Sequence, residues 1–124
     1  MQKEVLRLEK FWSSGGAEYI RTINHRYIKN NGKFIIPASL DAAVDTMYLM
    51  GDAGECIQNM LAIAHQFNHT IDNWVEQLVQ GTREFTVDSV LDEISPLKQA
   101  IEAAITATSL LFDEGNEGPE NSGS

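Results

Sequence analysis

The chain has 124 residues, of which 43% are hydrophobic and 22% are charged, and its formal net charge is −9. This length suits one domain with a modest apolar core and excludes two full domains. No run approaches the roughly 20 apolar residues of a membrane-spanning helix, and residues 1–10 lack the apolar core of a signal peptide. Cys56 is the only cysteine, so no internal disulfide forms, and we expect a cytoplasmic protein without membrane contact.

Charge is distributed unevenly along the chain. Residues 1–33 contain seven of the nine Lys and Arg residues and have a net charge of +4, whereas residues 34–124 have a net charge of −13. The acidic part argues against general nucleic-acid binding, which needs many Lys and Arg contacts to phosphate. Either the basic third pairs with the acidic part of the same molecule, or the polarised surface orients association with another charged protein.

The spacing of apolar residues predicts two helices in the first third of the chain, over residues 2–12 and 17–30. The small residues at 13–16 predict a turn between them. We expect Asn30, Asn31 and Gly32 to end the second helix, because Asn and Gly tolerate the left-handed conformation found at helix ends. The expected inward-facing residues are Val5, Leu8 and Trp12 in the first helix and Ile20, Ile23 and Tyr27 in the second.

An extended connector over residues 34–37 comes next, because Pro37 biases the residue before it away from helix. Ser39 is then placed to cap the longest predicted helix, which covers about residues 40–67. Residues 68–70 are expected to break this helix. Gly51 and Gly54 cost about 1 kcal/mol each relative to alanine inside a helix, so they predict a close backbone approach or a kink.

Three shorter helices are predicted after this break, over residues 71–80, 87–94 and 96–112. Gly81 ends the first of them, Thr86 caps the second, and Ser95-Pro96 marks a break before the third. Residues 113–124 contain almost no apolar side chain and predict a disordered acidic tail. The sequence therefore predicts an all-α fold: one domain over residues 1–112, a compact bundle of four to six helices around the long central helix.

The predicted long helix has an acidic stripe on one face. At 100° per residue, six polar side chains fall within about 80° of one another, and these are Asp41, Asp45, Tyr48, Asp52, Glu55 and Asn59. The opposite face is apolar. The stripe is a solvated face, a docking surface for a basic partner or for the chain's own basic helix, or a site for a hard cation such as Mg²⁺.

A basic face is predicted on the helix over residues 17–30. Arg21, His25 and Lys29 have the i, i+4, i+8 spacing of a single helix face, with Arg26 beside them. These groups suit either a partner protein or a phosphate group. In the second case the chain is a phosphate- or nucleotide-binding helical homo-oligomer.

Two short segments have acidic pairs, Asp52-Ala53-Gly54-Glu55 and Leu91-Asp92-Glu93-Ile94. They resemble the two metal-binding helices of MazG-like nucleoside triphosphate pyrophosphohydrolases, which are all-helical enzymes with E-x-x-E and E-x-x-D patterns. The resemblance implies Mg²⁺ at Asp52, Glu55 and Asp92 or Glu93, with metal-activated water attacking a nucleotide. Asp52 replaces a Glu of that pattern and Ser95 replaces its last Asp, so the implied enzyme is a degenerate one.

No catalytic constellation is complete in the sequence. A phosphate-binding loop, a nucleophile elbow and an H-E-x-x-H motif are all missing, and His65, His69 and Asp72 fall across the expected helix break. We therefore predict a non-enzymatic small acidic protein, without a cofactor, that binds another protein as an adaptor, assembly chaperone or inhibitor. Proteins of this style are frequent in phages and mobile elements.

Overall fold

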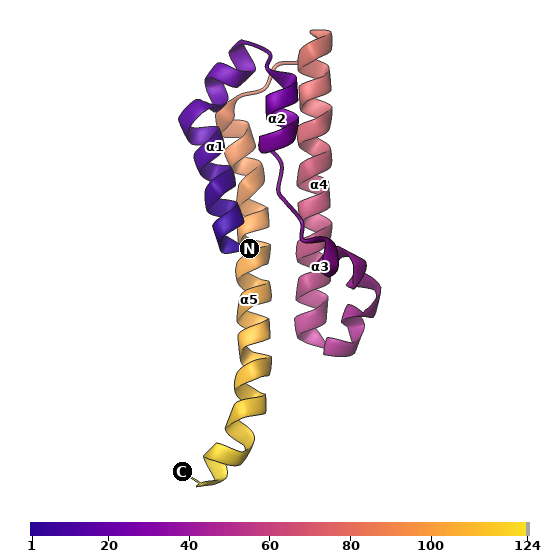
Figure 1. The fold of residues 1–124 in the computed structure, drawn as a ribbon, viewed down its shortest axis with the longest axis vertical. Helices are drawn as coiled ribbons and strands as arrows, with labels where there is room; N and C mark the ends of the chain where they lie inside the picture. The colour runs from indigo at the N-terminus through magenta and orange to yellow at the C-terminus, as the bar shows by residue number, and fades with distance from the viewer. Residues whose placement is uncertain (124) are drawn as a thin grey trace.

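Residues 1–123 fold into five α-helices and one 3₁₀ helix, and Figure 1 shows their arrangement. In this computed structural model, residues 1–123 are described, and side chains are described for residues 1–110. No strand occurs within residues 1–123, so the predicted all-α bundle of four to six helices is confirmed. The predicted disordered tail at 113–124 lies outside the residues whose side chains are described. The elements are α1 (Gln2–Arg21), α2 (His25–Asn31), α3 (Ala38–Ala42), the 3₁₀ helix η1 (Val44–Met50), α4 (Asp52–Gln80) and α5 (Val87–Gly123).

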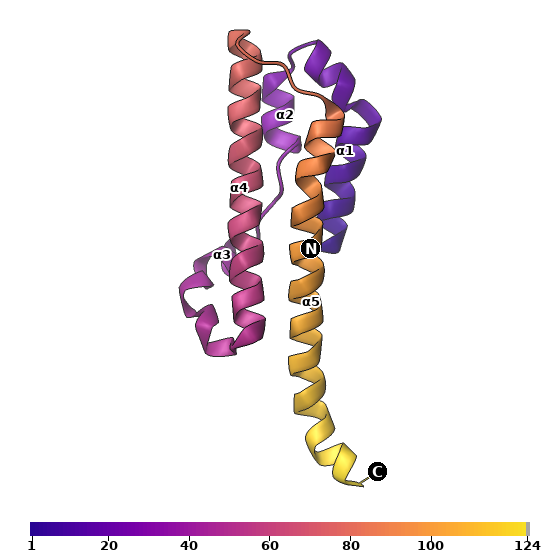
Figure 2. The ribbon, with the colours of Figure 1, turned by 180° about the vertical axis from the view of Figure 1, so that it is seen from behind.

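An antiparallel hairpin of α4 and α5 forms the axis of the molecule (Figure 1). The helix α1 packs along the first part of α5, and α2 lies between α1 and α4 (Figure 2). The chain then descends beside α4 to α3 and η1, which lie against the beginning of α4. Within the described residues, no helix is long and apolar enough to cross a membrane.

The core lies where α1 and α2 cover the hairpin. Trp12 is fully buried, and its indole Nε1 donates a hydrogen bond to the carbonyl oxygen of Gly32 at 3.0 Å. The buried side chains of α5 recur at a spacing of three and four residues, which places them on one helix face. The other fully buried large side chains are Leu8, Ile28, Leu61, Ile71, Val75, Val90, Ile94, Leu97 and Ile101.

Arg7 of α1 forms hydrogen bonds with the backbone at the end of α2. Its guanidinium donates hydrogen bonds to the carbonyl oxygens of Asn31 at 2.7 Å and Lys33 at 2.9 Å. The same group pairs with Glu4 at 2.7 Å, and this hydrogen-bonded carboxylate raises the pKa of Arg7 above its ordinary value. The start of the connector is therefore held by charged hydrogen bonds as well as by Trp12.

The predicted turn at residues 13–16 is wrong, because α1 continues to Arg21. Gly16 lies at the close approach of α1 and α5, where an added Cβ would meet the Trp12 ring at 2.9 Å and Val87 at 3.1 Å. The predicted single helix over 17–30 is also wrong. Residues 17–21 belong to α1, the chain then turns, and α2 begins at His25. Its expected core stripe is also wrong, because Ile23 and Tyr27 are 45% and 43% exposed while Ile28 is buried.

The predicted central helix over residues 40–67 is also wrong in its bounds. The chain forms α3 and η1 first, reverses at Gly51, whose φ is +62°, and only then begins α4. A side chain at Gly54 would fall on the backbone carbonyl of Met47. The close approach or kink predicted from the two glycines is thus confirmed: at Gly54 the backbone of η1 approaches, and at Gly51, where nothing among the described residues lies within 4 Å of an added Cβ, the chain reverses.

The break predicted at residues 68–70 does not occur, because Asn68 contacts the connector instead of ending the helix. Its side-chain amide donates to the carbonyl of Phe34 at 2.9 Å, and its oxygen accepts from the Phe34 N–H at 2.7 Å. The end of α4 at Gly81, with φ +74°, is as predicted. So is the cap of α5, where the Ser89 N–H donates to the Thr86 hydroxyl at 3.2 Å.

The break predicted at Ser95-Pro96 is wrong as well, since α5 is continuous there. Proline removes the hydrogen bond to the carbonyl four residues earlier, that of Asp92. Both Asp92 and Pro96 lie on the exposed side of α5, where water can satisfy that carbonyl. Burial of Ile94 and Leu97 on the opposite side holds the helix together.

Candidate functional site: an exposed apolar tip

The side chains of the 3₁₀ helix η1 lie in three rows along its axis. With three residues per turn, side chains three positions apart lie above one another. Val44, Met47 and Met50 form the row toward α4, in which Met47 is buried and Cβ of Met50 lies close to Gly54. The two other rows therefore face away from α4.

Large apolar side chains stand in these outward rows. Tyr48 is 67% exposed and Leu49 is 72% exposed, and Met50, which ends the row toward α4, is still 37% exposed. We call Tyr48, Leu49 and Met50 the apolar tip. It lies at the beginning of α4, at the opposite end of that helix from α2 (Figure 1).

Backbone contacts fix the apolar tip in place. The side-chain amide of Gln58 donates a hydrogen bond to the carbonyl of Val44 at 2.9 Å, and the Gly51 N–H donates to the carbonyl of Tyr48 at 3.2 Å. The tight approach of η1 to Gly54 adds a third restraint. The exposed side chains thus project from a held backbone.

Exposed carboxylates border the tip. Asp45 precedes Tyr48 in the same row of η1, and Asp52 and Glu55 lie in the first turn of α4. All three are exposed, and no lysine or arginine occurs in the sequence between Lys33 and Arg83. We call Asp45, Asp52 and Glu55 the acidic rim.

The single acidic stripe predicted on one helix is wrong, because its residues lie on three elements. Asp52, Glu55 and Asn59 keep the i, i+3, i+7 spacing on α4, and all three are exposed. Asp41, on α3, lies instead beside His65 of α4, with Oδ1 2.7 Å from Nε2. Asp41 is therefore a contact between α3 and α4 and not part of the rim.

The single basic face is also wrong, because Arg21 ends α1 whereas His25, Arg26 and Lys29 belong to α2. Arg21 pairs with Glu18 at 2.6 Å. The hydrogen bond between them lowers the pKa of Glu18 and raises that of Arg21. The spacing of Arg21, His25 and Lys29 thus does not assemble a phosphate site.

The carboxylates of the MazG-like pattern are not brought together. Asp52 begins α4 and Asp92 lies near the beginning of α5, and the hairpin is antiparallel (Figure 2). At a rise of about 1.5 Å per residue, the two pairs lie roughly 30 Å apart along the hairpin. Among the described residues no group of His, Cys, Asp and Glu is arranged to hold a metal. The metal site that the resemblance implied is therefore contradicted by the fold.

The histidines of α4 share a face, because the helix is not interrupted at 68–70. Each possible ligand has another neighbour: His65 lies beside Asp41, His69 lies 3.2 Å from the Asn73 amide, and Asp72 pairs with Lys33 at 3.2 Å. The Asp41–His65 contact joins α3 to α4, the Lys33–Asp72 pair joins the start of the connector to α4, and the His69–Asn73 contact lies within α4. In this geometry His65, His69 and Asp72 have structural contacts and do not form a metal site.

No family model, curated protein or solved structure matches the chain. The assignment of the apolar tip as the candidate functional site therefore rests on its geometry alone. Sequence reasoning assigned Met50 to a core face and Tyr48 to the acidic stripe, and it did not single out Leu49. The available signal was a run of four consecutive large apolar residues, Met47 to Met50, directly before Gly51.

Proposed function

We propose that this chain is a non-enzymatic protein that binds another protein through the apolar tip, as an adaptor, assembly chaperone or inhibitor. The single observation that supports the proposal is the exposure of Tyr48 and Leu49, 67% and 72%, on a backbone that Gln58 and Gly54 hold in place. Consecutive exposed apolar side chains of this size lose stabilising burial in the free protein. They regain it when a partner covers them.

The arrangement has the anatomy of a binding surface. Protein interfaces combine an apolar centre, often with Tyr, and a polar rim that stays in contact with water. The apolar tip supplies the first feature and the acidic rim supplies the second. The partner that fits is a protein with an apolar pocket bordered by Lys or Arg side chains, since opposite charges steer association and fix its orientation.

The test starts with partners that co-purify with the chain from the organism that encodes it. The affinity of each purified partner is then measured for the unchanged protein and for Leu49→Asp. If Leu49 is an anchor, Leu49→Asp weakens binding by at least about 30-fold, which corresponds to ~2 kcal/mol. Asp45→Lys combined with Glu55→Lys is expected to slow association and to remove most of its dependence on salt.

Leu6→Asp is the matched control, because Leu6 is an exposed leucine, at 61%, on α1 far along the chain from the tip. It should leave the affinity unchanged within about threefold, as expected for a residue outside an interface. Equal losses for Leu49→Asp and Leu6→Asp would contradict the proposal. So would partners whose binding depends on neither.

A further inference from the structure

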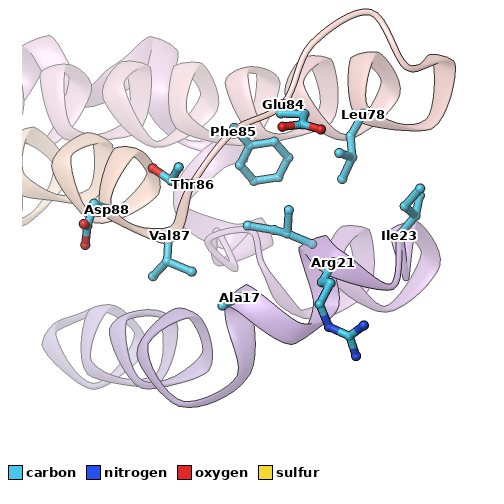
Figure 3. A pocket seen from close by; sticks show the side chains of 10 residues that line it. Ala17, Arg21, Ile23, Leu78, Glu84, Phe85, Thr86, Val87 and Asp88 are labelled. Carbon is cyan, nitrogen blue, oxygen red and sulfur yellow. The ribbon is translucent and has the colours of Figure 1, made fainter.

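A cavity lies at the opposite end of α4 from the apolar tip, where the end of α1 faces the loop between α4 and α5 (Figure 3). Its volume is about 520 Å³, within the range of small-molecule sites, about 300–1,000 Å³. Phe85 and Leu78 project into it from the α4 and α5 side, and Ala17 and Ile20 of α1 line it from the other. Its walls are thus largely hydrocarbon.

The charged groups at the mouth are predominantly acidic. Glu84 and Asp88 line the cavity, and neither forms an ion pair or a side-chain hydrogen bond with the described residues. Arg21 also lines it, but its side chain points away from the cavity centre and pairs with Glu18 at 2.6 Å (Figure 3). The neighbouring Arg83 stacks over the Trp74 ring at 5.4 Å. Glu84, which lies beside Phe85 and Leu78, therefore remains for a ligand, whereas Asp88 lies at the edge of the cavity and its carboxylate points away from the centre (Figure 3).

A strained residue completes the lining. Ile23 has a φ of +53°, in the left-handed region that a β-branched side chain rarely adopts. Its side chain lines the cavity and is 45% exposed, so burial in the free protein covers only about half of its surface. A glycine would make the same turn with less strain. An occupant of the cavity would cover the exposed hydrocarbon of Ile23 and explain why isoleucine stands there.

We propose that this cavity binds a small organic cation with an apolar body, whose hydrocarbon lies against Phe85, Leu78 and Ile23 and whose charged nitrogen faces Glu84. The apolar walls select the body of the ligand, and the Glu84 carboxylate selects its charge. The proposal is independent of partner binding at the apolar tip, because the two sites lie at opposite ends of α4.

The test uses 4-phenylbutylamine as the probe and 4-phenylbutyrate, which has the same body and the opposite charge, as its match. Two-dimensional NMR of the full chain should show amine-induced shifts at residues 17–23, 78 and 84–88, with a Kd of about 1 mM for a probe of this size. 4-Phenylbutyrate should bind at least about tenfold more weakly, because its carboxylate meets Glu84 with like charge.

Variants identify the site. Ala17→Phe should fill the cavity mouth and abolish binding, and circular dichroism and thermal unfolding check that the variant folds. Glu84→Gln should weaken amine binding about threefold, as expected for an exposed ion pair. Glu93→Gln, which removes an exposed carboxylate of α5 outside the cavity, should leave binding unchanged.

Ile23→Gly separates a ligand contact from a merely structural role. It should raise the unfolding temperature by relieving the strained turn and at the same time weaken amine binding. Unchanged affinity in Ile23→Gly, equal affinity for amine and carboxylate, shifts that map elsewhere, or no binding by the unchanged protein would each overturn the proposal. The Leu49→Asp variant should bind the amine with unchanged affinity. Failure of the proposed partner binding at the apolar tip and failure of the proposed amine binding in this cavity are therefore distinguishable.

Discussion

The two ends of the α4 helix treat large apolar side chains in opposite ways. At the end near α2, Trp12 is fully buried, and Phe85 packs edge-on against it with ring centroids 6.2 Å apart. At the other end, Tyr48 and Leu49 are mostly exposed. Both regions are built on the same hairpin, so the difference comes from what covers it.

A third layer exists at one end only. The helices α1 and α2 close the α4–α5 groove near Trp12, whereas only the short α3 and η1 lie against the beginning of α4. Short segments bury fewer side chains and leave their outward rows in water. The Trp12 region therefore supplies most of the folding stability, and the apolar tip is available for binding at little cost to it.

Removing the centre of the Trp12 region has the largest expected effect. Trp12→Ala should lower the free energy of unfolding by about 3–5 kcal/mol, since it creates a large cavity and leaves the Gly32 carbonyl without its donor. Leu49→Ala at the apolar tip should change it by less than about 0.5 kcal/mol. Urea denaturation measures both. Similar losses for the two variants would show that the regions do not differ in this way.

A smaller and local effect is expected at the contact between η1 and α4. Gly54→Ala forces η1 away from the helix, because the new methyl falls on the Met47 carbonyl, and it should cost about 1–3 kcal/mol. Hydrogen exchange should increase at residues 44–50 and remain slow around Trp12. Gly15→Ala is the control, since its methyl meets only the movable Tyr19 ring, at 3.0 Å. Faster exchange throughout the chain would contradict a local role for Gly54.

The smallest of these effects concerns the connector that joins the two regions. Asn68→Ala removes both hydrogen bonds to the Phe34 backbone, and about 1–2 kcal/mol of stability should be lost. The matched control is Asn73→Ala, whose amide contacts only the exposed His69 ring. Thermal unfolding compares the two, and equal shifts would mean that the Phe34 contact contributes nothing of its own.

Much of the fold could be predicted from local patterns. The cap at Thr86, the left-handed end at Gly81 and the extended connector before Pro37 each depend on the backbone preferences of one or two residues. The inward faces of residues 2–12 and 71–80 follow from helical spacing, and Val5, Leu8, Ile71 and Val75 are indeed buried. Such features form in almost any tertiary setting.

The errors share one cause. Asn68, Gly16 and Pro96 are all residues that commonly end helices, and here each lies inside one. Asn68 binds the Phe34 backbone, Gly16 lets α1 approach α5, and Pro96 faces water. Packing against neighbours outweighs a local preference of about 1–3 kcal/mol, and those neighbours are distant in the sequence.

The sequence by itself determined that the chain is all-helical and strongly acidic after residue 33, and that Gly51 and Gly54 mark a close backbone approach or a kink. Helical periodicity, charge and glycine cost are properties of the residues themselves. Only the tertiary structure decided that residues 44–50 fold back on α4, and so that Tyr48 and Leu49 face water instead of a core. That outcome depends on which row of η1 meets Gly54, a contact between two segments whose relative placement no local pattern encodes.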